Sequence, residues 1–143
     1  MDKIWDLIVL FFASFVAATL LPAQSELVLA SLSYRGYYDK ITLLMVATFG
    51  NVLGSWINWI MGAYLIKFKN RRWFPVKEKS IKKYSKIYDK WGVWSLLFAW
   101  LPIVGDPLTV IAGIFKTNIW LFILLVTIGK LSRYAVILYI FYK

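Results

Sequence analysis

The apolar positions of this chain fall into runs of unequal length, separated by polar residues and helix breakers. The two longest runs, residues 41–66 and 119–142, can each cross a bilayer as one helix, because a span takes about 20 apolar residues. A third run covers residues 4–21. The runs at 26–34 and 108–115 are too short to cross a bilayer alone. This pattern predicts an all-α integral membrane protein.

Similar breaks interrupt the apolar runs in the two halves of the chain. In both, a proline follows a leucine, and an acid, Glu26 or Asp106, comes four residues after the proline. Lipid cannot satisfy the backbone groups that such a break frees, so half-helices of this kind usually meet at a polar site inside the membrane. The predicted helix breaks are Pro22, Pro102, Gly105 and Pro107.

The two halves follow one plan. Repeat one covers residues 4–66, a basic linker covers 67–90, and repeat two covers 91–143. Each repeat is a broken helical hairpin, which we expect to be re-entrant, followed by one transmembrane helix. Each half then crosses the membrane an odd number of times, so the two sequential copies are inverted repeats. The alternative topology has four full spans with kinks at the two Leu-Pro breaks.

The linker differs in composition from the rest of the chain. Its ten Lys and Arg residues face only two acids, Glu78 and Asp89. The residues Ile81, Tyr84, Tyr88 and Trp91 fall on one face of a helix. This spacing predicts a basic amphipathic helix lying on the membrane surface, and a solvated charged loop is the alternative. In either case the positive-inside rule predicts a cytoplasmic linker.

Composition narrows the class of partner. Hydrophobic residues make up 61% of the 143 residues, and the net charge is +10. The basic residues concentrate beside apolar spans, which favours membrane lipids with anionic headgroups as partners rather than nucleic acid. The chain contains no Cys and no His, so it lacks a zinc ligand set, and we expect no metal and no cofactor.

Four ionisable residues lie within apolar runs: Glu26, Asp106, Lys130 and Arg133. Charges in the membrane interior are costly and mark binding or transport pathways more often than mere packing. Lys130 and Arg133 are three residues apart on one helix face and could bind a phosphate group. Glu26 and Asp106 could hold or exchange a proton. The alternative is an ionic staple that only joins the two halves.

Small and polar residues recur at helical spacing along the run at 41–66. The set is Gly50, Asn51, Gly54, Ser55, Asn58 and Gly62. Such a stripe mostly serves close helix packing, but two amides favour a polar path, so we predict that Asn51 and Asn58 line it. Gly50 and Gly54 form a small-xxx-small pattern and are a candidate contact of a homo-oligomer.

An enzyme is not expected. The absence of Cys and His removes two common nucleophiles and bases, and no phosphate-binding glycine loop is present. Gly105-Asp106 is similar to part of an intramembrane aspartyl protease site. Such a protease needs a second membrane-embedded aspartate, because the two acids share one proton. We expect no such partner for Asp106.

Several motifs together carry a family resemblance. They are the segment from Ala17 to Glu26, Gly50-Asn51-x-x-Gly54, the segment from Trp100 to Asp106, and Gly129-Lys130-x-x-Arg133-Tyr134. In this order they resemble the YqaA-like branch of the DedA family, in the superfamily of SNARE-associated Golgi or VTT-domain proteins. The resemblance implies a multi-pass inner-membrane protein with two opposed re-entrant hairpins. It also implies translocation of phospholipid or undecaprenyl phosphate, with proton coupling.

The chain departs from the family's main branch at the second break. Main-branch members carry arginines three residues before and three after the hairpin proline, where this chain has Ala99 and Gly105. Lys130 and Arg133 are predicted to replace them. The sequence thus favours a transporter or scramblase for an anionic lipid. The alternative is a non-transporting structural or assembly protein whose buried charges only stabilise the helix bundle.

Overall fold

The computed structural model describes residues 3–19, 24–74 and 76–142, and every regular element in these ranges is a helix. The elements are α1 (Lys3–Thr19), α2 (Gln24–Arg35), α3 (Lys40–Tyr64), the 3-10 helix η1 (Ile66–Phe68), α4 (Glu78–Trp91), the 3-10 helix η2 (Gly92–Trp100), α5 (Gly105–Ile114) and α6 (Ile119–Phe141). The predicted all-α class is confirmed.

Local capping sets the start of both long helices. Asp39 precedes α3, and its carboxylate accepts a hydrogen bond from the Thr42 amide at 2.8 Å. That bond, together with one from the Thr42 hydroxyl, lowers the pKa of Asp39. Asn118 caps α6 in the same way, since its side-chain oxygen accepts a hydrogen bond from the Trp120 amide at 3.0 Å. The last residue of each preceding loop, Asp39 or Asn118, therefore sets where the long helix begins.

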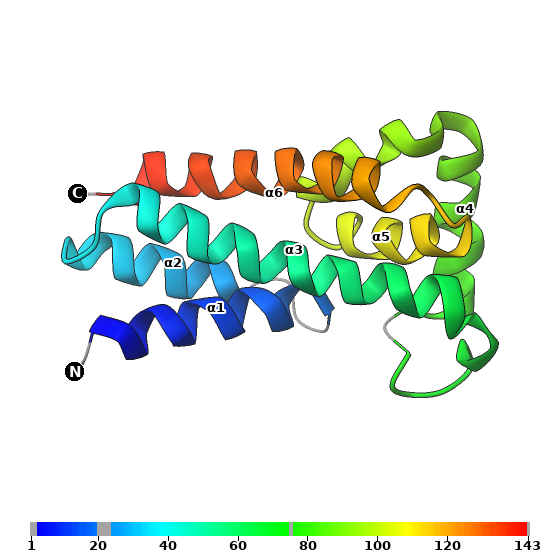
Figure 1. Cartoon of the computed structure of the whole chain (residues 1–143), viewed down its shortest axis with the longest axis horizontal. Coiled ribbons are helices and arrows are strands. Elements are labelled where there is room, and N and C mark those ends of the chain that lie inside the picture. Colours follow the sequence, from blue (N-terminus) through cyan, green and yellow to red (C-terminus); the bar gives the residue numbers. More distant parts are fainter. Residues whose placement is uncertain (1–2, 20–23, 75, 143) are drawn as a thin grey trace.

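Two helices run the length of the molecule (Figure 1). With a rise of 1.5 Å per residue, α3 is about 38 Å long and α6 about 35 Å long, against a hydrocarbon core of about 30 Å. Within the described residues, these two are the helices long and apolar enough to cross a membrane. By the same rise α2 and α5 reach only about 18 Å and 15 Å.

The two hairpins occupy opposite halves of the molecule (Figure 1). The first consists of α1 and α2, and the second of η2 and α5. α3 packs against α1 and α5, whereas α6 packs against η2 and α2. Each long helix therefore packs mainly against one arm of each hairpin, and the ends of the arms approach the middle of the molecule from opposite directions.

The glycine-containing stripe of α3 packs inside the chain. A Cβ atom added at Gly50 would lie 2.5 Å from the Phe11 carbonyl oxygen of α1, and one at Gly62 would lie 2.0 Å from the Val110 carbonyl oxygen of α5. Gly54 meets α1 in the same way. The proposed homo-oligomer contact at Gly50 and Gly54 is therefore wrong, because α1 covers this face.

The second hairpin turns over a shorter segment than the sequence indicated. Pro102 lies in the turn between η2 and α5, beside Ile103, whose backbone has the positive φ of 72° that is rare for a β-branched residue. Gly105 and Pro107, predicted as breaks, instead form the first turn of α5. Proline is tolerated there, since the N–H it lacks would have no partner within the helix. The predicted break at Pro22 lies outside the described residues.

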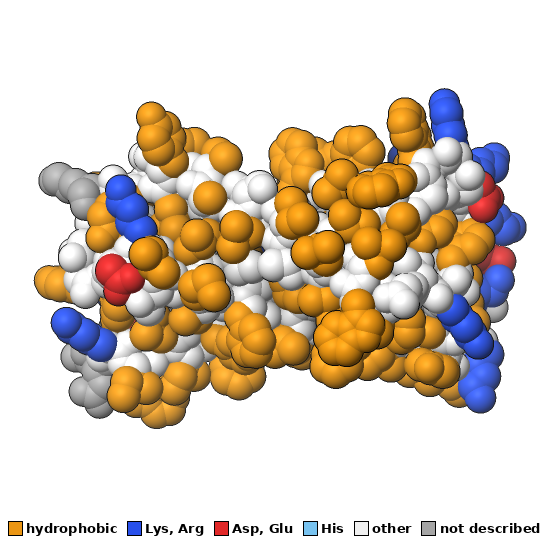
Figure 2. All heavy atoms as spheres, turned by 45° about the horizontal axis from the view of Figure 1, so that its top comes forward, with side chains coloured by type: hydrophobic (Ala, Val, Ile, Leu, Met, Phe, Trp, Pro, Cys, Tyr) orange, Lys and Arg blue, Asp and Glu red, His pale blue; other side chains and the backbone are white. Residues whose placement is uncertain are grey.

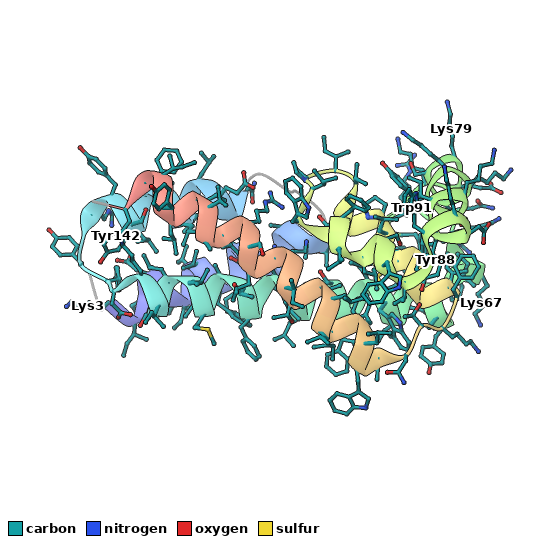
Figure 3. The ribbon with its side chains drawn as sticks, turned by 90° about the horizontal axis from the view of Figure 1, so that it is seen from above. Lys3, Lys67, Lys79, Tyr88, Trp91 and Tyr142 are labelled. Atoms are coloured by element: carbon teal, nitrogen blue, oxygen red, sulfur yellow. The ribbon has the colours of Figure 1, made fainter. Side chains whose placement is uncertain are left out.

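The predicted linker helix is confirmed as α4, which crosses one end of the molecule (Figures 1 and 3). The alternative of a solvated loop is therefore wrong over Glu78–Trp91. Tyr84 and Tyr88 are buried in a core cluster with residues of α5 and α6, whereas Trp91 is exposed. Most of the apolar stripe thus packs on protein and closes this end of the helix bundle.

The face of the molecule in Figure 2 is apolar in the middle and charged at both ends. Large hydrophobic side chains from all the long elements are exposed, among them Phe12, Met45, Trp120 and Tyr139. A soluble monomer rarely exposes so much contiguous apolar surface. The apolar middle region matches the lipid-facing surface of an integral membrane protein, and the charged ends of the molecule would then lie in water or at the lipid headgroups.

The α3–α5 contact yields a stability prediction. We expect Gly62→Ala to lower the free energy of unfolding by about 1–3 kcal/mol or more, because the added methyl group overlaps the Val110 carbonyl and pushes the helices apart. Thermal unfolding of purified protein in mild detergent measures the change. Gly129→Ala is the matched control, since its Cβ atom would lie 3.4 Å from its nearest neighbours. Equal melting temperatures for the two variants would contradict this packing.

Candidate functional site

Two ion pairs meet on α6 near the middle of the molecule. Lys130 and Arg133 project from α6, and their partners Asp106 and Glu26 lie in the first turns of α5 and α2. An acid in the first turn of a helix is stabilised by the helix dipole, and a nearby cation stabilises it further. The structure thus brings together all four ionisable residues that the sequence singled out, as two separate pairs.

Arg133 and Glu26 form the more accessible pair. The Arg133 Nε atom donates to Glu26 Oε1 at 2.6 Å, and Nη2 donates to the same oxygen. The Glu26 side chain is 35% exposed and that of Arg133 is 9% exposed. Charge-assisted bonds of this kind are strong and directional. Because these bonds use only the Nε and Nη2 atoms, the guanidinium has N–H donors left for another acceptor.

Lys130 and Asp106 form the sealed pair. Lys130 Nζ donates to Asp106 Oδ1 at 2.7 Å, and the lysine side chain is 1% exposed. The Asp106 side chain is 18% exposed. A lysine buried to this degree cannot reach water by snorkelling, so its charge depends on Asp106. This pair therefore fixes the tip of the second hairpin to α6.

A cavity of about 530 Å³ lies beside the accessible pair. Glu26, Arg133 and Ser132 contribute polar groups to its wall, and the other lining residues are mostly apolar, including Trp100 and Val136. Several of the apolar lining residues are also exposed on the surface of the molecule. The cavity is therefore an apolar groove between α6 and the second hairpin, with the Glu26–Arg133 ion pair at one place in its wall.

Asn51 links three helices through hydrogen bonds. Its side-chain amide donates to the Ser14 carbonyl oxygen at 3.0 Å and to the Tyr134 hydroxyl at 2.8 Å. Tyr134 in turn donates to the Ser25 hydroxyl at 3.0 Å. This buried chain joins α3 to α1, α6 and α2, and it ends one residue before Glu26.

Asn58 makes the equivalent link two turns further along α3. Its amide donates to the Ala18 carbonyl oxygen at 2.8 Å and to the Thr109 hydroxyl at 3.1 Å. The Thr109 hydroxyl donates to the Asp106 carbonyl oxygen at 2.6 Å. Among the described residues, the side-chain oxygens of Asn51 and Asn58 have no hydrogen-bond partner. The two amides support the hairpins, and their role in lining a path stays a prediction.

The two positions that differ from the family's main branch leave no room for arginine. Ala99 is fully buried, and a Cβ atom added at Gly105 would lie 2.3 Å from the Ala99 carbonyl oxygen. The arms of the second hairpin therefore touch backbone to backbone at this point. The cations at the tip come from α6 instead, where Lys130 and Arg133 reach the first turns of both short helices.

The sequence analysis assigned no role in the site to three polar residues that contribute to it: Ser25, Thr109 and Tyr134. Tyr134 follows Lys130 by four residues on the same face of α6, so its spacing was a usable signal. Ser25 and Thr109 show no such signal in the sequence, because Ser and Thr side chains in helices often form hydrogen bonds only to their own backbone. Within the described ranges no group of three or more acidic residues is placed to hold a metal ion.

Comparisons with known proteins identify the family. The model for the VTT domain matches residues 4–143. The inner membrane protein YqaA of Escherichia coli is 34% identical over 137 residues, which covers 96% of this chain and 92% of that protein. An uncharacterized protein of Haemophilus influenzae is 30% identical over 92% of this chain and 84% of its own length. No solved structure matches the chain.

The sealed ion pair yields a second stability prediction. We expect Lys130→Met to lower the free energy of unfolding by about 3–5 kcal/mol, because it leaves the Asp106 carboxylate buried without its cation. The double change Lys130→Met with Asp106→Leu should recover most of this loss, since no charge is then left unpaired. Chemical unfolding in mild detergent measures both. A double variant no more stable than Lys130→Met would contradict the pairing.

Proposed function

Because the chain belongs to the VTT-domain (DedA) family of membrane proteins, we propose that it translocates or scrambles an anionic lipid across the inner membrane. The observation that carries this proposal is the apolar groove with the Glu26–Arg133 pair in its wall. A groove of this kind suits an amphiphile, since the acyl chains contact its apolar wall and the phosphate meets the guanidinium. A phospholipid or undecaprenyl phosphate has this chemistry.

We further propose that the fold consists of two inverted repeats. The pattern of helix packing supports this, since the main contacts among α1, α2 and α3 correspond to those among η2, α5 and α6, and each long helix also packs on one arm of the other half. The α3–α1 contact then corresponds to α6–η2, and α3–α5 corresponds to α6–α2. Glu26 and Asp106 occupy equivalent first turns. Opposed repeats that meet at a central site are common in transporters.

The hairpins are proposed to be re-entrant. At about 18 Å and 15 Å, α2 and α5 are too short to cross a hydrocarbon core of about 30 Å. Re-entry also explains why their first turns carry an acid, because a helix that begins inside the membrane has no water to bind its free N–H groups. The basic linker then lies on the cytoplasmic side with α4.

The two ion pairs have different proposed roles. A phosphate that enters the groove competes with Glu26 for Arg133, and a proton on Glu26 would release the guanidinium by neutralising the carboxylate. This exchange is the proposed route of proton coupling. Asp106 and Lys130 would hold the tip of the second hairpin in place while Arg133 changes partner. Asn51 and Asn58 would line the path between the hairpins.

The second candidate function is a structural or assembly role in the membrane. The Lys130–Asp106 pair favours it, because Lys130 is buried at the helix junction and neither residue lines the groove beside Arg133. On this view the groove beside Arg133 is filled by bulk lipid and nothing is moved. The two candidates differ in what they predict for Arg133, which a transport assay can test directly.

The transport prediction concerns Arg133. In proteoliposomes, we expect the protein to flip a fluorescent anionic phospholipid or undecaprenyl phosphate, and Arg133→Gln to slow flipping at least about tenfold through the loss of charge-assisted bonds. Glu26→Gln should change the pH dependence of flipping. Lys79→Gln is the matched control, because this exposed lysine lies in α4 away from the groove. Folded protein that flips neither lipid would favour the structural role.

The topology prediction uses single cysteines, since the chain has none of its own. With a membrane-impermeant maleimide, we expect Lys79→Cys to react from the cytoplasmic side and Ile41→Cys from the opposite side. Gln24→Cys, at the start of α2, should react slowly from both sides if the first hairpin is re-entrant. Fast reaction of Gln24→Cys from the same side as Lys79→Cys would show that α1 and α2 each cross the membrane.

A further inference from the structure

We propose that the open end of the first hairpin, between the start of α1 and the end of α2, binds the phosphate headgroup of an anionic phospholipid. This end lies opposite the basic linker, as Lys3 and Lys79 mark in Figure 3. The use of this site as an entry or exit for transported lipid rests on the proposed function, whereas the binding itself does not. The groups that form it are Lys3, Asp6, Arg35, Tyr37 and Tyr38.

Asp6 has a fixed partner at this end. The Tyr38 hydroxyl donates to Asp6 Oδ2 at 2.7 Å, and Tyr38 itself is buried. This hydrogen bond, with burial as the second cause, raises the pKa of Tyr38 to about 12, so the phenol keeps its proton at neutral pH. The Tyr142 hydroxyl donates to the Tyr38 carbonyl oxygen at 2.9 Å and anchors the turn to α6. The carboxylate is therefore oriented by tyrosine rather than by arginine.

Arg35 is left available for a ligand. Its Nη1 atom lies 3.9 Å from Asp6 Oδ2, which is beyond hydrogen-bond distance, and its side chain is 46% exposed. It is the last residue of α2. A guanidinium in this state has several donors in a planar fork that matches a phosphate group. Lys3 on the facing helix adds a second positive charge to the same cavity.

Two cavities meet at Arg35 and Asp6. One, of about 280 Å³, lies at the end of the molecule and has the charged side chain of Lys3 and the ring of Tyr37 in its wall as well. The other, of about 380 Å³, runs between α1 and α2 and is lined mainly by apolar side chains, among them Val9 and Leu27. A cavity with charged groups beside a more apolar cavity suits an amphiphile, with the headgroup outermost and an acyl chain toward the middle of the membrane.

The apolar cavity leads toward the central site. Leu27, at its inner end, follows Glu26 directly in α2. Arg35 lies nine residues beyond Glu26, which corresponds to about 14 Å along the helix axis. The two arginines, Arg35 and Arg133, would thus bind phosphate at the membrane face and at its middle. A lipid rather than a free anion is the proposed occupant, because the wall between the two positions is apolar.

The test measures occupancy of the apolar cavity by the reactivity of a cysteine. Ser31 lines this cavity and is exposed, so Ser31→Cys should react with a maleimide. In nanodiscs of phosphatidylcholine with increasing phosphatidylglycerol, we expect the maleimide to label the Ser31→Cys protein progressively more slowly. In the Arg35→Gln background, half-protection should need about tenfold more phosphatidylglycerol. Arg35→Lys keeps the positive charge, so half-protection in this background should need a smaller increase in phosphatidylglycerol.

Two control cysteines separate this site from other effects. Ile41→Cys is exposed at the same end of the molecule, so it reports the slowing caused by the negative bilayer surface alone. Ser132→Cys lies in the groove beside Arg133, and its protection should not depend on Arg35. Inorganic phosphate in pure phosphatidylcholine nanodiscs should give Ser31→Cys no protection, because it does not occupy an apolar cavity.

Three outcomes would overturn the proposal: slowing of Ser31→Cys no greater than that of Ile41→Cys, equal protection with and without Arg35, or equal protection by inorganic phosphate. Each of these is independent of transport. The proposed function fails instead when the wild-type protein flips no lipid. Protection of Ser31→Cys that depends on Arg35 would then still establish a headgroup site.

Discussion

Two ion pairs on α6 hold the first turns of two half-length helices, and the position of both hairpins depends on them. The start of a helix presents unbonded N–H groups and the positive end of the helix dipole. Glu26 and Asp106 offset this charge in α2 and α5, and each acid then needs a cation of its own. Lys130 and Arg133 supply both from one helix, so two hairpins from opposite ends of the molecule converge on α6.

The two pairs are chemically alike but differently placed. Asp106 and Lys130 are enclosed by protein, which suits a fixed support, whereas Glu26 and Arg133 face an apolar groove open at the molecular surface. Close contact between the arms of the second hairpin, at Ala99 and Gly105, excludes long side chains from that tip. Among the described residues, the cations of both central pairs come from α6, and of the two Arg133 is the one that lines the groove.

The small and polar residues of α3, from Gly50 to Gly62, are only partly explained by the sequence. Helical spacing predicts that they share one face of α3, but spacing alone does not predict which helix covers that face. In the structure, α1 packs against the first half of this face and α5 against the second half, so Gly50 and Gly54 make contacts within the chain. Asn51 and Asn58 each reach a helix of the other half, through Tyr134 and Thr109, which no local pattern could predict.

The sequence by itself determined the helices, the two long spans, the break at the second hairpin, the family and the four charges within apolar runs. These follow from short-range physics: the length of apolar runs, the geometry of proline, and the high cost of a charge in lipid. Only the tertiary structure decided which acid pairs with which base, which pair is sealed, and that α4 turns its tyrosines onto the bundle. Those outcomes depend on packing between residues up to 107 positions apart, and apolar periodicity carries no information about such contacts.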